Sequence, residues 1–292
     1  MKTDVFHCGY VAIVGKPNVG KSTLLNLLLG EKLSAVTPKP QTTRHRILGI
    51  LNGENYQIIF LDTPGLISEP KYKLQELMKK TLNSAIKGAD LVVVMREVND
   101  ESQIESELLN HKKGAILVIN KIDLIQKDGL LPLIGSVQKL YDFKEIIPIS
   151  AIKKEGIDRL LDCIIKYLPA NPAYFPKDIL TNQPEKFFVA EIIREKIFKE
   201  YGEEVPYSTT VAIEEFKERE GRKDYIRAII YVEKDSQKAI LIGAKGDKLK
   251  KIGSIARQEI EAFLDRPVFL ELWVKTKKKW KDNLSMLKSF GY

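Results

Sequence analysis

Residues 15–22 read GKPNVGKS, a run whose glycines, lysine and serine have the spacing of a phosphate-binding loop. The apolar run YVAIV precedes it and TLLNLLLG follows it, so the local order is strand, loop and helix. Gly15 and Gly20 allow backbone conformations in which successive N–H groups point at the phosphates, and the helix N-terminus adds its positive dipole end. Lys21 is then placed to neutralise the β- and γ-phosphates, and the Ser22 hydroxyl to ligate Mg²⁺.

Two later segments contain residues suited to the same triphosphate. DTPG follows the apolar run YQIIFL, which places Asp62 near the magnesium, through water, and the Gly65 N–H near the γ-phosphate. KPQTTRHR, at 39–46, is expected to be a mobile loop that closes on the γ-phosphate through a threonine hydroxyl on Mg²⁺. Of its two threonines, Thr43 is favoured over Thr42.

NKID and SAI each follow an apolar strand, and together they point to guanine as the base. Asp123 would accept hydrogen bonds from guanine N1–H and N2–H₂, a paired donor edge that adenine lacks. Lys121 would lie along the base plane, Asn120 would tie this loop to the phosphate loop, and the Ala151 N–H would reach guanine O6. Sites built on such hydrogen bonds discriminate by roughly 10⁴-fold or more. NKID alone suits a polar turn, but four motifs in order, each after a strand, predict a guanine nucleotide site.

The complete prediction for this site covers the nucleotide, the metal and the hydrolytic residues. The predicted nucleotide-binding residues are Gly15, Lys16, Pro17, Asn18, Val19, Gly20, Lys21, Ser22, Thr23, Asp62, Thr63, Pro64, Gly65, Asn120, Lys121, Asp123, Ser150, Ala151 and Ile152. The predicted Mg²⁺ ligands are Ser22, Thr43 and Asp62. Lys21, Thr43 and Gly65 are the expected catalytic residues for hydrolysis of GTP to GDP and phosphate.

The residue that orients the attacking water is not identified by the sequence. A Ras-type GTPase has a glutamine directly after its DxxG motif, and Leu66 stands at that position here. We therefore expect slow intrinsic turnover, nearer the ~10⁻⁴ s⁻¹ of an unassisted Ras-like site than a typical enzyme rate.

A second glycine pair, GAKG at 243–246, lacks the lysine-serine pair of a phosphate loop. The apolar AILI before it suggests a short strand, and the basic amphipathic helix after it makes the pair a tight turn between two helical segments in a KH-type domain. Such a domain clamps about four nucleotides of single-stranded RNA. The predicted RNA-binding residues are Ile242, Gly243, Ala244, Lys245, Gly246, Lys248, Lys250, Lys251 and Arg257.

Positive charge is concentrated at the C-terminal end of the chain. The formal net charge is +8, and the 55 residues from Lys238 onward contain 13 Lys and Arg against 6 Asp and Glu. A positive field beside a glycine turn suggests a polyanionic partner, with RNA or an acidic membrane surface as the main candidates. The alternative is a face that serves solubility alone.

The order of expected elements divides the 292 residues into two domains, a size at which each can bury its own core. Residues 10–168 alternate apolar strands with amphipathic helices, and NGEN separates one pair of strands, which predicts an α/β fold: a mainly parallel six-stranded sheet with one antiparallel hairpin and helices on both faces. A proline-rich linker and a small α+β domain with a three-stranded sheet, helices and a basic tail follow. The expected boundaries are 1–169, 170–185 and 186–292.

Several classes of protein are disfavoured by composition. No apolar run approaches the ~18 residues of a membrane span, and the N-terminus lacks the apolar core of a signal peptide. Cys8 and Cys163 are far apart in sequence and have no histidine partners, so neither a disulfide nor a zinc site is expected. A reducing cytosol is the expected compartment.

The chain as a whole resembles the Era family, bacterial P-loop GTPases with a C-terminal KH domain that assist assembly of the small ribosomal subunit. GKPNVGKS, QTTRHR, DTPG, NKID, SAI and IGAKGDKLKKIGSIAR carry the resemblance, in order and across both domains. It implies a monomer that binds near the 3′ end of small-subunit ribosomal RNA in the 30S subunit, with GTP governing access to the RNA site. Members of the family also have a hydrophobic residue where Ras has glutamine, as at Leu66. Asn18 matches a loop asparagine that ligates a monovalent cation such as K⁺ in related GTPases, or else it only shapes the loop.

Two other readings remain at this stage. One is a GTPase at the membrane surface, anchored by KTKKKWKDNLSMLKSF, whose lysines and Trp280 suit an acidic interface. The other is a scaffold that barely hydrolyses GTP and acts by occupancy alone. Peripheral contact with the inner face of the cell membrane is also compatible with RNA binding.

Overall fold

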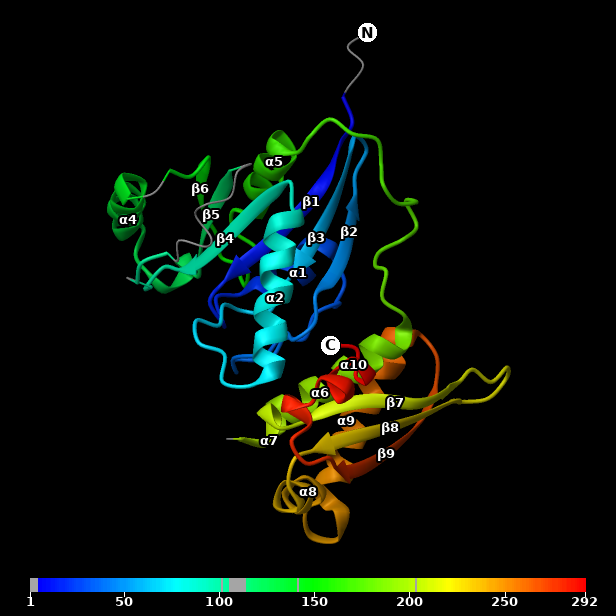
Figure 1. Ribbon diagram of the computed structural model, residues 1–292. Helices are drawn as coiled ribbons and strands as arrows, with labels where there is room; N and C mark the ends of the chain where they lie inside the picture. Colours follow the sequence, from blue (N-terminus) through cyan, green and yellow to red (C-terminus); the bar gives the residue numbers. More distant parts are fainter. Residues whose placement is uncertain (1–4, 101, 105–113, 141, 203) are drawn as a thin grey trace. The chain divides into compact units, whose positions relative to one another are not determined.

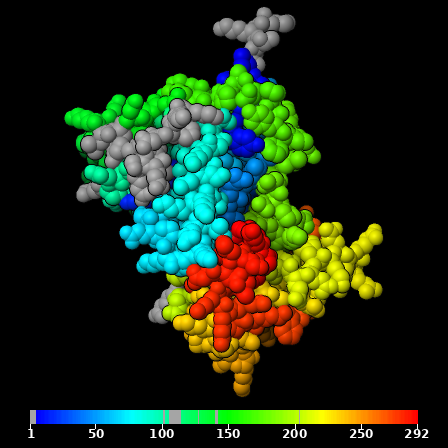
Figure 2. Space-filling view, viewed as in Figure 1, coloured from blue at the N-terminus to red at the C-terminus, as the bar shows by residue number. Residues whose placement is uncertain are grey.

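The computed structural model describes residues 5–100, 102–104, 114–140, 142–202 and 204–292 (Figures 1 and 2). Its contacts divide the chain into two units. The first comprises Met1–Ser34, Thr43–Glu69 and Met78–Asn182, and the second comprises Ala35–Thr42, Pro70–Leu77 and Gln183–Tyr292. Two short segments expected in the first domain thus belong, by their contacts, to the second unit. The boundaries at 169 and 186 remain a prediction.

Within the described residues, the first unit contains a six-stranded sheet in the order β2-β3-β1-β4-β5-β6. All neighbouring strands are parallel except β2 and β3, which confirms the predicted mainly parallel sheet with one antiparallel hairpin. The strands are β1 (His7–Gly15), β2 (Ile47–Asn52), β3 (Tyr56–Asp62), β4 (Leu91–Glu97), β5 (Ala115–Asn120) and β6 (Glu145–Pro148). The helices are α1 (Lys21–Leu29), α4 (Lys127–Leu140), α5 (Ile157–Tyr167) and α2 (Lys73–Gly88), whose residues up to Leu77 belong to the second unit.

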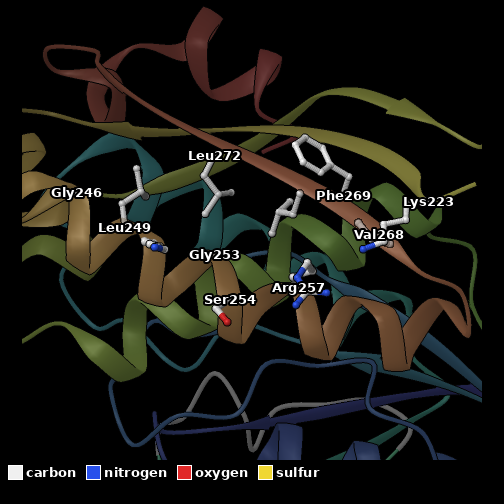
Figure 3. A pocket seen from close by; sticks show the side chains of 11 residues that line it. Lys223, Gly246, Leu249, Gly253, Ser254, Arg257, Val268, Phe269 and Leu272 are labelled. Atoms are coloured by element: carbon white, nitrogen blue, oxygen red, sulfur yellow. The ribbon is translucent and has the colours of Figure 1, made fainter.

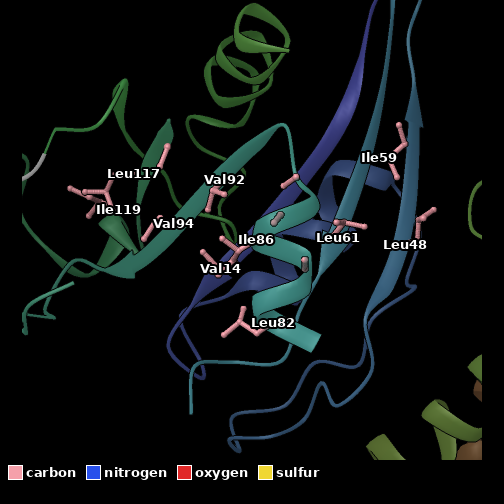
Figure 4. Close-up of a cluster of buried hydrophobic side chains, with 14 of the residues drawn as sticks. Val14, Leu48, Ile59, Leu61, Leu82, Ile86, Val92, Val94, Leu117 and Ile119 are labelled. Carbon is pink, nitrogen blue, oxygen red and sulfur yellow. The ribbon is translucent and has the colours of Figure 1, made fainter. Parts of the chain in front are cut away.

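The core of this unit lies between the sheet and its helices. Every residue of β5, and all but the last of β4, is buried, as expected for central strands covered on both faces. In Figure 4, side chains from β1, β3, β4 and β5 gather opposite Leu82 and Ile86 of α2. Because β1 is parallel to β3 and β4, and β4 to β5, the carboxyl ends of these strands meet at one edge of the sheet. The segments that follow them are therefore neighbours.

The proline-rich segment after α5 is bound to the first unit along much of its length. Ile50 N–H of β2 donates to the Leu180 carbonyl at 2.7 Å. The Gln57 side chain accepts from the Tyr174 and Phe175 N–H groups at 2.8 and 2.9 Å. Figure 1 shows the segment running beside β2. A linker was expected from composition, but residues up to 180 are fixed against the edge of the sheet.

The second unit contains, in its described part, a three-stranded sheet in the order β7-β8-β9, as predicted. The β7 and β8 strands are antiparallel, while β8 and β9 are parallel. The strands are β7 (Thr210–Lys217), β8 (Asp224–Val232) and β9 (Val268–Thr276); the helices are α6 (Glu185–Glu200), α7 (Glu204–Tyr207), α8 (Asp235–Ile242), α9 (Asp247–Leu264) and α10 (Leu284–Ser289). Buried residues of α6, α8 and α9 pack on one face of the sheet.

The reading of AILI, at 239–242, as a short strand was wrong. These residues form the end of helix α8, which Gly243 terminates at φ 74°. A run of four apolar residues cannot by itself distinguish a strand from a buried helix segment. The glycine pair lies between two helices, as the KH-type pattern requires.

The C-terminal tail folds onto the second unit. Trp280 is fully buried, and its indole N–H donates to the Ser208 carbonyl at 3.0 Å. Its ring also packs edge-on against Phe290, which in turn contacts Tyr231 of β8. Trp280 is therefore a core residue in this conformation, which removes it from the proposed membrane-anchoring surface. Among the described residues, no helix has the length and apolar character needed to span a bilayer.

Candidate nucleotide site and candidate RNA groove

The phosphate loop lies between β1 and α1, and its glycines are sterically required. A Cβ on Gly15 would lie 2.3 Å from the Met95 carbonyl oxygen, and a Cβ on Gly20 would lie 2.3 Å from Asn120 Nδ2. Asn18, between them, has a left-handed backbone with φ 66°. The loop is thus tightly enclosed by the ends of β4 and β5, and a bulkier residue at either glycine would displace it.

Lys21, the first residue of α1, is folded back into this loop. Its Nζ donates to the carbonyl oxygens of Gly15 at 3.0 Å and of Lys16 at 2.7 Å. Burial lowers the pKa of Lys21 to about 8, and the charge of Asp62 opposes that shift. Phosphate oxygens beside this ammonium would favour its charged form.

Oxygen atoms from three separate segments meet beside the loop. Ser22 Oγ lies 3.0 Å from Thr43 Oγ1 and donates to Asp62 Oδ2 at 3.0 Å. Ser34 also donates to Asp62 Oδ2, at 2.6 Å, while Asp62 Oδ1 is buried without a hydrogen-bond partner. Burial raises the pKa of Asp62, and the bonds from Ser34 and Ser22 and the charge of Lys21 oppose this. Ser34 was not predicted from the sequence.

This oxygen cluster suits a hard divalent cation such as Mg²⁺, which binds through few carboxylates and keeps several waters. The buried, unpartnered Asp62 Oδ1 is the kind of acceptor that a water or ion would satisfy. Thr42 is directed elsewhere, because its Oγ1 hydrogen-bonds to Thr37 Oγ1 and to the Lys39 carbonyl, both at 2.6 Å. Within the described residues, no cluster of three His, Cys, Asp or Glu side chains forms an alternative metal site.

On the base side of the site, Asn120 links the two predicted loops. Its Nδ2 donates to the Val19 carbonyl at 2.8 Å, and its Oδ1 accepts from the Ala151 N–H at 3.0 Å. The first bond is the tie to the phosphate loop that we expected. The second engages the N–H that was assigned to guanine O6, so that N–H would have to be shared with Asn120 or released to reach a base.

Asp123, the predicted guanine receptor, is oriented by Ser150, whose Oγ donates to Asp123 Oδ1 at 2.5 Å. Lys121 has φ 67° and forms an ion pair with Glu97 at the end of β4. Glu97 was missed because a single acidic residue after a buried strand gives no distinguishing signal. The hydrogen bond between Ser150 and Asp123 joins the SAI and NKID motifs.

Three further residues predicted to bind the nucleotide, Thr63, Ile152 and Gly65, have different surroundings. Thr63 is buried and donates to the Ile13 carbonyl at 2.9 Å, which makes its hydroxyl a structural group. Ile152 is 72% exposed. A Cβ on Gly65 would lie 2.9 Å from the Pro17 nitrogen, and the Leu66 N–H donates to the Gly15 carbonyl at 3.1 Å. DTPG and the phosphate loop are therefore in direct contact, as the motif order predicts.

The segment leading to Thr43 is bound by helix α6, within the second unit. The Arg194 guanidinium donates to the Thr42 carbonyl and pairs with Glu191, whose Oε1 is 2.8 Å from its Nε. The ammonium of Lys39 donates to the carbonyls of Phe198 and Tyr201. None of these α6 contacts was predicted, because charged residues in an amphipathic helix are ordinarily solvated.

A cavity of about 490 Å³ lies between α9 and β9 (Figure 3). Its lining residues are Lys223, Gly246, Leu249, Lys250, Gly253, Ser254, Arg257, Val268, Phe269, Leu270 and Leu272. A floor of apolar side chains with three cations at its rim suits the bases and phosphates of a single strand. Gly253 lacks a side chain beside Leu272, which keeps this part of the groove open.

The predicted RNA residues divide between this groove and the surface. Gly246, Lys250 and Arg257 line the groove, whereas Lys251 forms an ion pair with Glu200 of α6 and Lys248 lies over the Tyr201 ring. Ile242 is the last residue of α8, and Gly243, Ala244 and Lys245 form the turn before α9; none of these four residues lines the groove. The residues of β9 that line the groove were not predicted from the sequence. The signal was available, because alternate residues of VFLELWV point to one face of a strand, and Val268, Leu270 and Leu272 line the groove.

Comparisons with known proteins identify both domains of the chain. A family model for 50S ribosome-binding GTPases matches residues 10–121, and a KH-domain model matches residues 204–281. The chain is 50% identical over 297 aligned residues to GTPase Era of Geotalea uraniireducens, covering all of both chains. The chain belongs to the Era family of GTPases. Within that family, GTPase Era of Clostridium perfringens is 46% identical with 99% of each chain covered.

Solved Era structures show the same fold in two ligand states. An Aquifex aeolicus Era variant bound to GDP and AlF₄⁻ is 43% identical, with a TM-score of 0.94 and 98% and 99% of the two chains covered. Era in complex with MgGDPNP and nucleotides 1506–1542 of 16S ribosomal RNA matches equally well. Family membership makes this chain a GTPase that binds and hydrolyses a guanine nucleotide. The scaffold that barely hydrolyses GTP and acts by occupancy alone stays a prediction.

Proposed function

We propose that this GTPase is a nucleotide-controlled switch that binds small-subunit ribosomal RNA near its 3′ end and assists assembly of the 30S subunit. The observation that carries the proposal is the presence, in one chain, of a guanine nucleotide site and a KH groove with cations at its rim. The Era structure that contains 16S nucleotides 1506–1542 supports this choice of RNA. The switch acts as a monomer in the cytoplasm, where ribosomal subunits assemble.

In the nucleotide site, the side chains have distinct tasks. Asp123, held by Ser150, receives the paired donors of guanine, and Asn120 fixes the distance between the base and the phosphate loop. Lys21 and the N–H groups of the phosphate loop balance the phosphate charge. Thr43 brings the mobile segment to the γ-phosphate, so loss of that phosphate on hydrolysis releases the segment.

Ser22, Thr43 and Asp62 are the residues we propose to hold Mg²⁺. When bound, this ion would neutralise charge on the β- and γ-phosphate oxygens. Asn18 has two candidate roles, as a ligand for K⁺ or as a residue that shapes the loop through its left-handed backbone. Comparison of the hydrolysis rate in KCl and NaCl for the wild type and Asn18→Asp separates them, because only the ligand role predicts a K⁺ preference that the variant changes.

Helix α6 contacts two segments of the second unit, the one before Thr43 and the helix that borders the RNA groove. It binds residues 35–42 through Arg194 and Glu195, and the next residue, Thr43, lies in the oxygen cluster. The same helix packs on α9, which forms one wall of the RNA groove. Release of Thr43 after hydrolysis would therefore alter the contacts between residues 35–42 and α6, the helix that supports the groove.

The test is crosslinking of the full chain to 16S ribosomal RNA with GDPNP, with GDP and without nucleotide. We expect crosslinks at the groove residues Lys250 and Arg257, with a yield that changes between GDPNP and GDP. Equal yields in all three states would overturn the switch, and crosslinks elsewhere on the chain would overturn the groove assignment.

Membrane association is the second candidate function. The basic tail favours it, and the burial of Trp280 weighs against it, because the aromatic ring expected at an acidic membrane surface is part of the core. Binding to vesicles with and without anionic lipid is measured at salt concentrations where the RNA still binds. Binding that requires anionic lipid under these conditions supports membrane association, and its absence leaves RNA binding as the function.

A further inference from the structure

The face of the C-terminal sheet opposite α6, α8 and α9 is contacted by the C-terminal tail at Tyr231, and elsewhere it presents aromatic rings to solvent. Along β9, Val268 and Val274 point into the core, whereas Phe269 and Trp273 are 55% and 52% exposed. Figure 3 shows the Phe269 ring and the Leu272 side chain on opposite sides of the strand, as the period of two requires. Two large aromatic residues on one strand face are therefore left uncovered in the described structure.

The polar groups of Trp273 and of Tyr225 on β8 are already hydrogen-bonded within this face. Glu271 of β9 accepts from the Trp273 indole N–H at 2.8 Å, from the Tyr225 hydroxyl and from Arg227 Nε at 3.2 Å. These bonds orient the Trp273 and Tyr225 rings, and the Trp273 side chain stays 52% exposed. Pre-oriented rings lose little conformational entropy when something stacks on them.

Tyr225 of β8 extends the aromatic surface across two strands. Its ring stacks on Phe269 with centroids 6.0 Å apart and an interplanar angle of 12°. The guanidinium groups of Arg219 and Arg227 lie 5.0 and 5.5 Å from the Tyr225 centroid. We call Tyr225, Phe269 and Trp273, with Arg219 and Arg227, the outer platform.

This combination of flat aromatic rings and guanidinium planes favours nucleic acid as the occupant. Bases stack on exposed aromatic and arginine planes, and nearby cations neutralise the phosphates. A protein partner is disfavoured, because the core of a protein–protein interface is depleted of charged residues. Here the rings are surrounded by charges of both signs, from Lys217, Lys275, Glu214 and Glu215.

The outer platform is also continuous with the RNA groove. Phe269 borders the groove, yet its ring lies on the outer side of β9. A strand leaving the groove past Phe269 would next meet Tyr225 and Trp273. A KH groove holds about four nucleotides, and the RNA in the related Era complex is far longer. An RNA of that length extends beyond the groove.

We propose that the outer platform is a second RNA-binding surface, on which unpaired bases outside the KH groove stack against Trp273 and Phe269. The proposal rests on the proposed RNA-binding function and assigns it an additional site. Trp273 is the decisive residue, because it is exposed, lies outside the groove and leaves Glu271 two other partners when removed.

The test compares two RNA probes on the full-length chain: one matching nucleotides 1506–1542, and single-stranded pieces of it about four nucleotides long. Trp273→Ala should weaken binding of the long RNA by about tenfold, the effect of losing one stacked base, and leave the short pieces unchanged. Trp273→Phe should restore most of the affinity, and Leu284→Ala, another exposed apolar residue, should have no effect.

Tryptophan fluorescence supplies an independent readout. The chain has two tryptophans, of which Trp280 is buried and Trp273 is exposed. Long RNA should quench the emission of the wild type and leave that of Trp273→Phe unchanged.

Each failure has a distinct appearance. If the wild type binds neither RNA, the proposed RNA-binding function fails. If short RNA binds normally but Trp273→Ala binds long RNA as the wild type does, the outer platform is not an RNA site. A change of oligomeric state in Trp273→Ala, with RNA affinity intact, would instead make the platform a protein interface and overturn the proposal.

Discussion

Ser22 Oγ and Thr43 Oγ1 lie 3.0 Å apart, although 21 positions separate the two residues in the chain. The first is fixed at the start of α1 and the second ends the segment that α6 binds. Ser22, Thr43 and Asp62 all belong to the first unit, whereas Thr42, the residue directly before Thr43, belongs to the second.

If Thr43 is the Mg²⁺ ligand, substitution of Thr43 should reduce GTP hydrolysis far more than substitution of the adjacent Thr42. Thr43→Ala should lower kcat/KM for GTP by about tenfold to a hundredfold, the usual range for groups that support a metal site. Thr42→Ala, whose hydroxyl bonds only within its own loop, should lose far less. Hydrolysis rates across a Mg²⁺ titration measure this, and equal losses would reassign the ligand.

Ser150 is predicted to act through Asp123. Ser150→Ala removes a hydrogen bond to a charged group, commonly worth about 1.5–3 kcal/mol, and should weaken GDP binding by roughly tenfold or more. Asp123→Asn should abolish the preference for guanine over adenine nucleotides. Asp158→Asn, in the first turn of α5, is the matched control. Competition binding with GDP and ADP checks all three, and unchanged selectivity in Asp123→Asn would remove Asp123 from the base site.

In the groove, Lys250 is predicted to contact a phosphate. Lys250→Gln should weaken RNA binding at all sequences and reduce the slope of log affinity against log salt by about 0.7, the value for one phosphate on a single strand. Lys186→Gln, on the exposed side of α6, is the control of equal charge change. A salt slope that stays the same in Lys250→Gln would place the phosphate elsewhere.

The Arg194–Glu191 pair predicts a non-additive loss of stability. Arg194→Met removes the guanidinium that pairs with the buried Glu191 carboxylate and should lower the free energy of unfolding of the second unit by about 3–5 kcal/mol. Adding Glu191→Leu should recover most of that loss. Urea unfolding followed by tryptophan fluorescence reports this unit, since both tryptophans belong to it. If the free energy of unfolding lost in the double variant equals the sum of the losses in the two single variants, the two side chains act independently.

A pH dependence follows from Asp224 and Arg266. Burial raises the pKa of Asp224, but the hydrogen bonds from Arg266 and from the Arg219 N–H outweigh it and leave that pKa below its ordinary value. A folded pKa below the unfolded one stabilises the protein above the unfolded pKa, and this is lost as pH falls through the folded pKa. Arg266→Gln should therefore be less stable than wild type at neutral pH, with the difference narrowing between about pH 5 and pH 2. A difference that does not depend on pH would exclude this carboxylate as its source.

Much of the nucleotide site was readable in the sequence because its parts are local. Gly15, Gly20 and Lys21 lie within one loop whose geometry depends on neighbouring residues, and DTPG, NKID and SAI each follow a strand. Parallel strands bring those ends together, so motif order was enough to predict their proximity. The AILI run failed for the opposite reason: four apolar residues fit a helix and a strand equally well.

What the sequence determined by itself was the fold class, the guanine site and the position of the glycine turn, since these depend on hydrophobic period and backbone freedom. Only the tertiary structure decided that Arg194 binds the segment before Thr43, that Trp280 is a core residue and that Trp273 is exposed. The physical reason is that burial and pairing of a charged or aromatic side chain depend on which distant elements pack beside it, and chain order does not specify those partners.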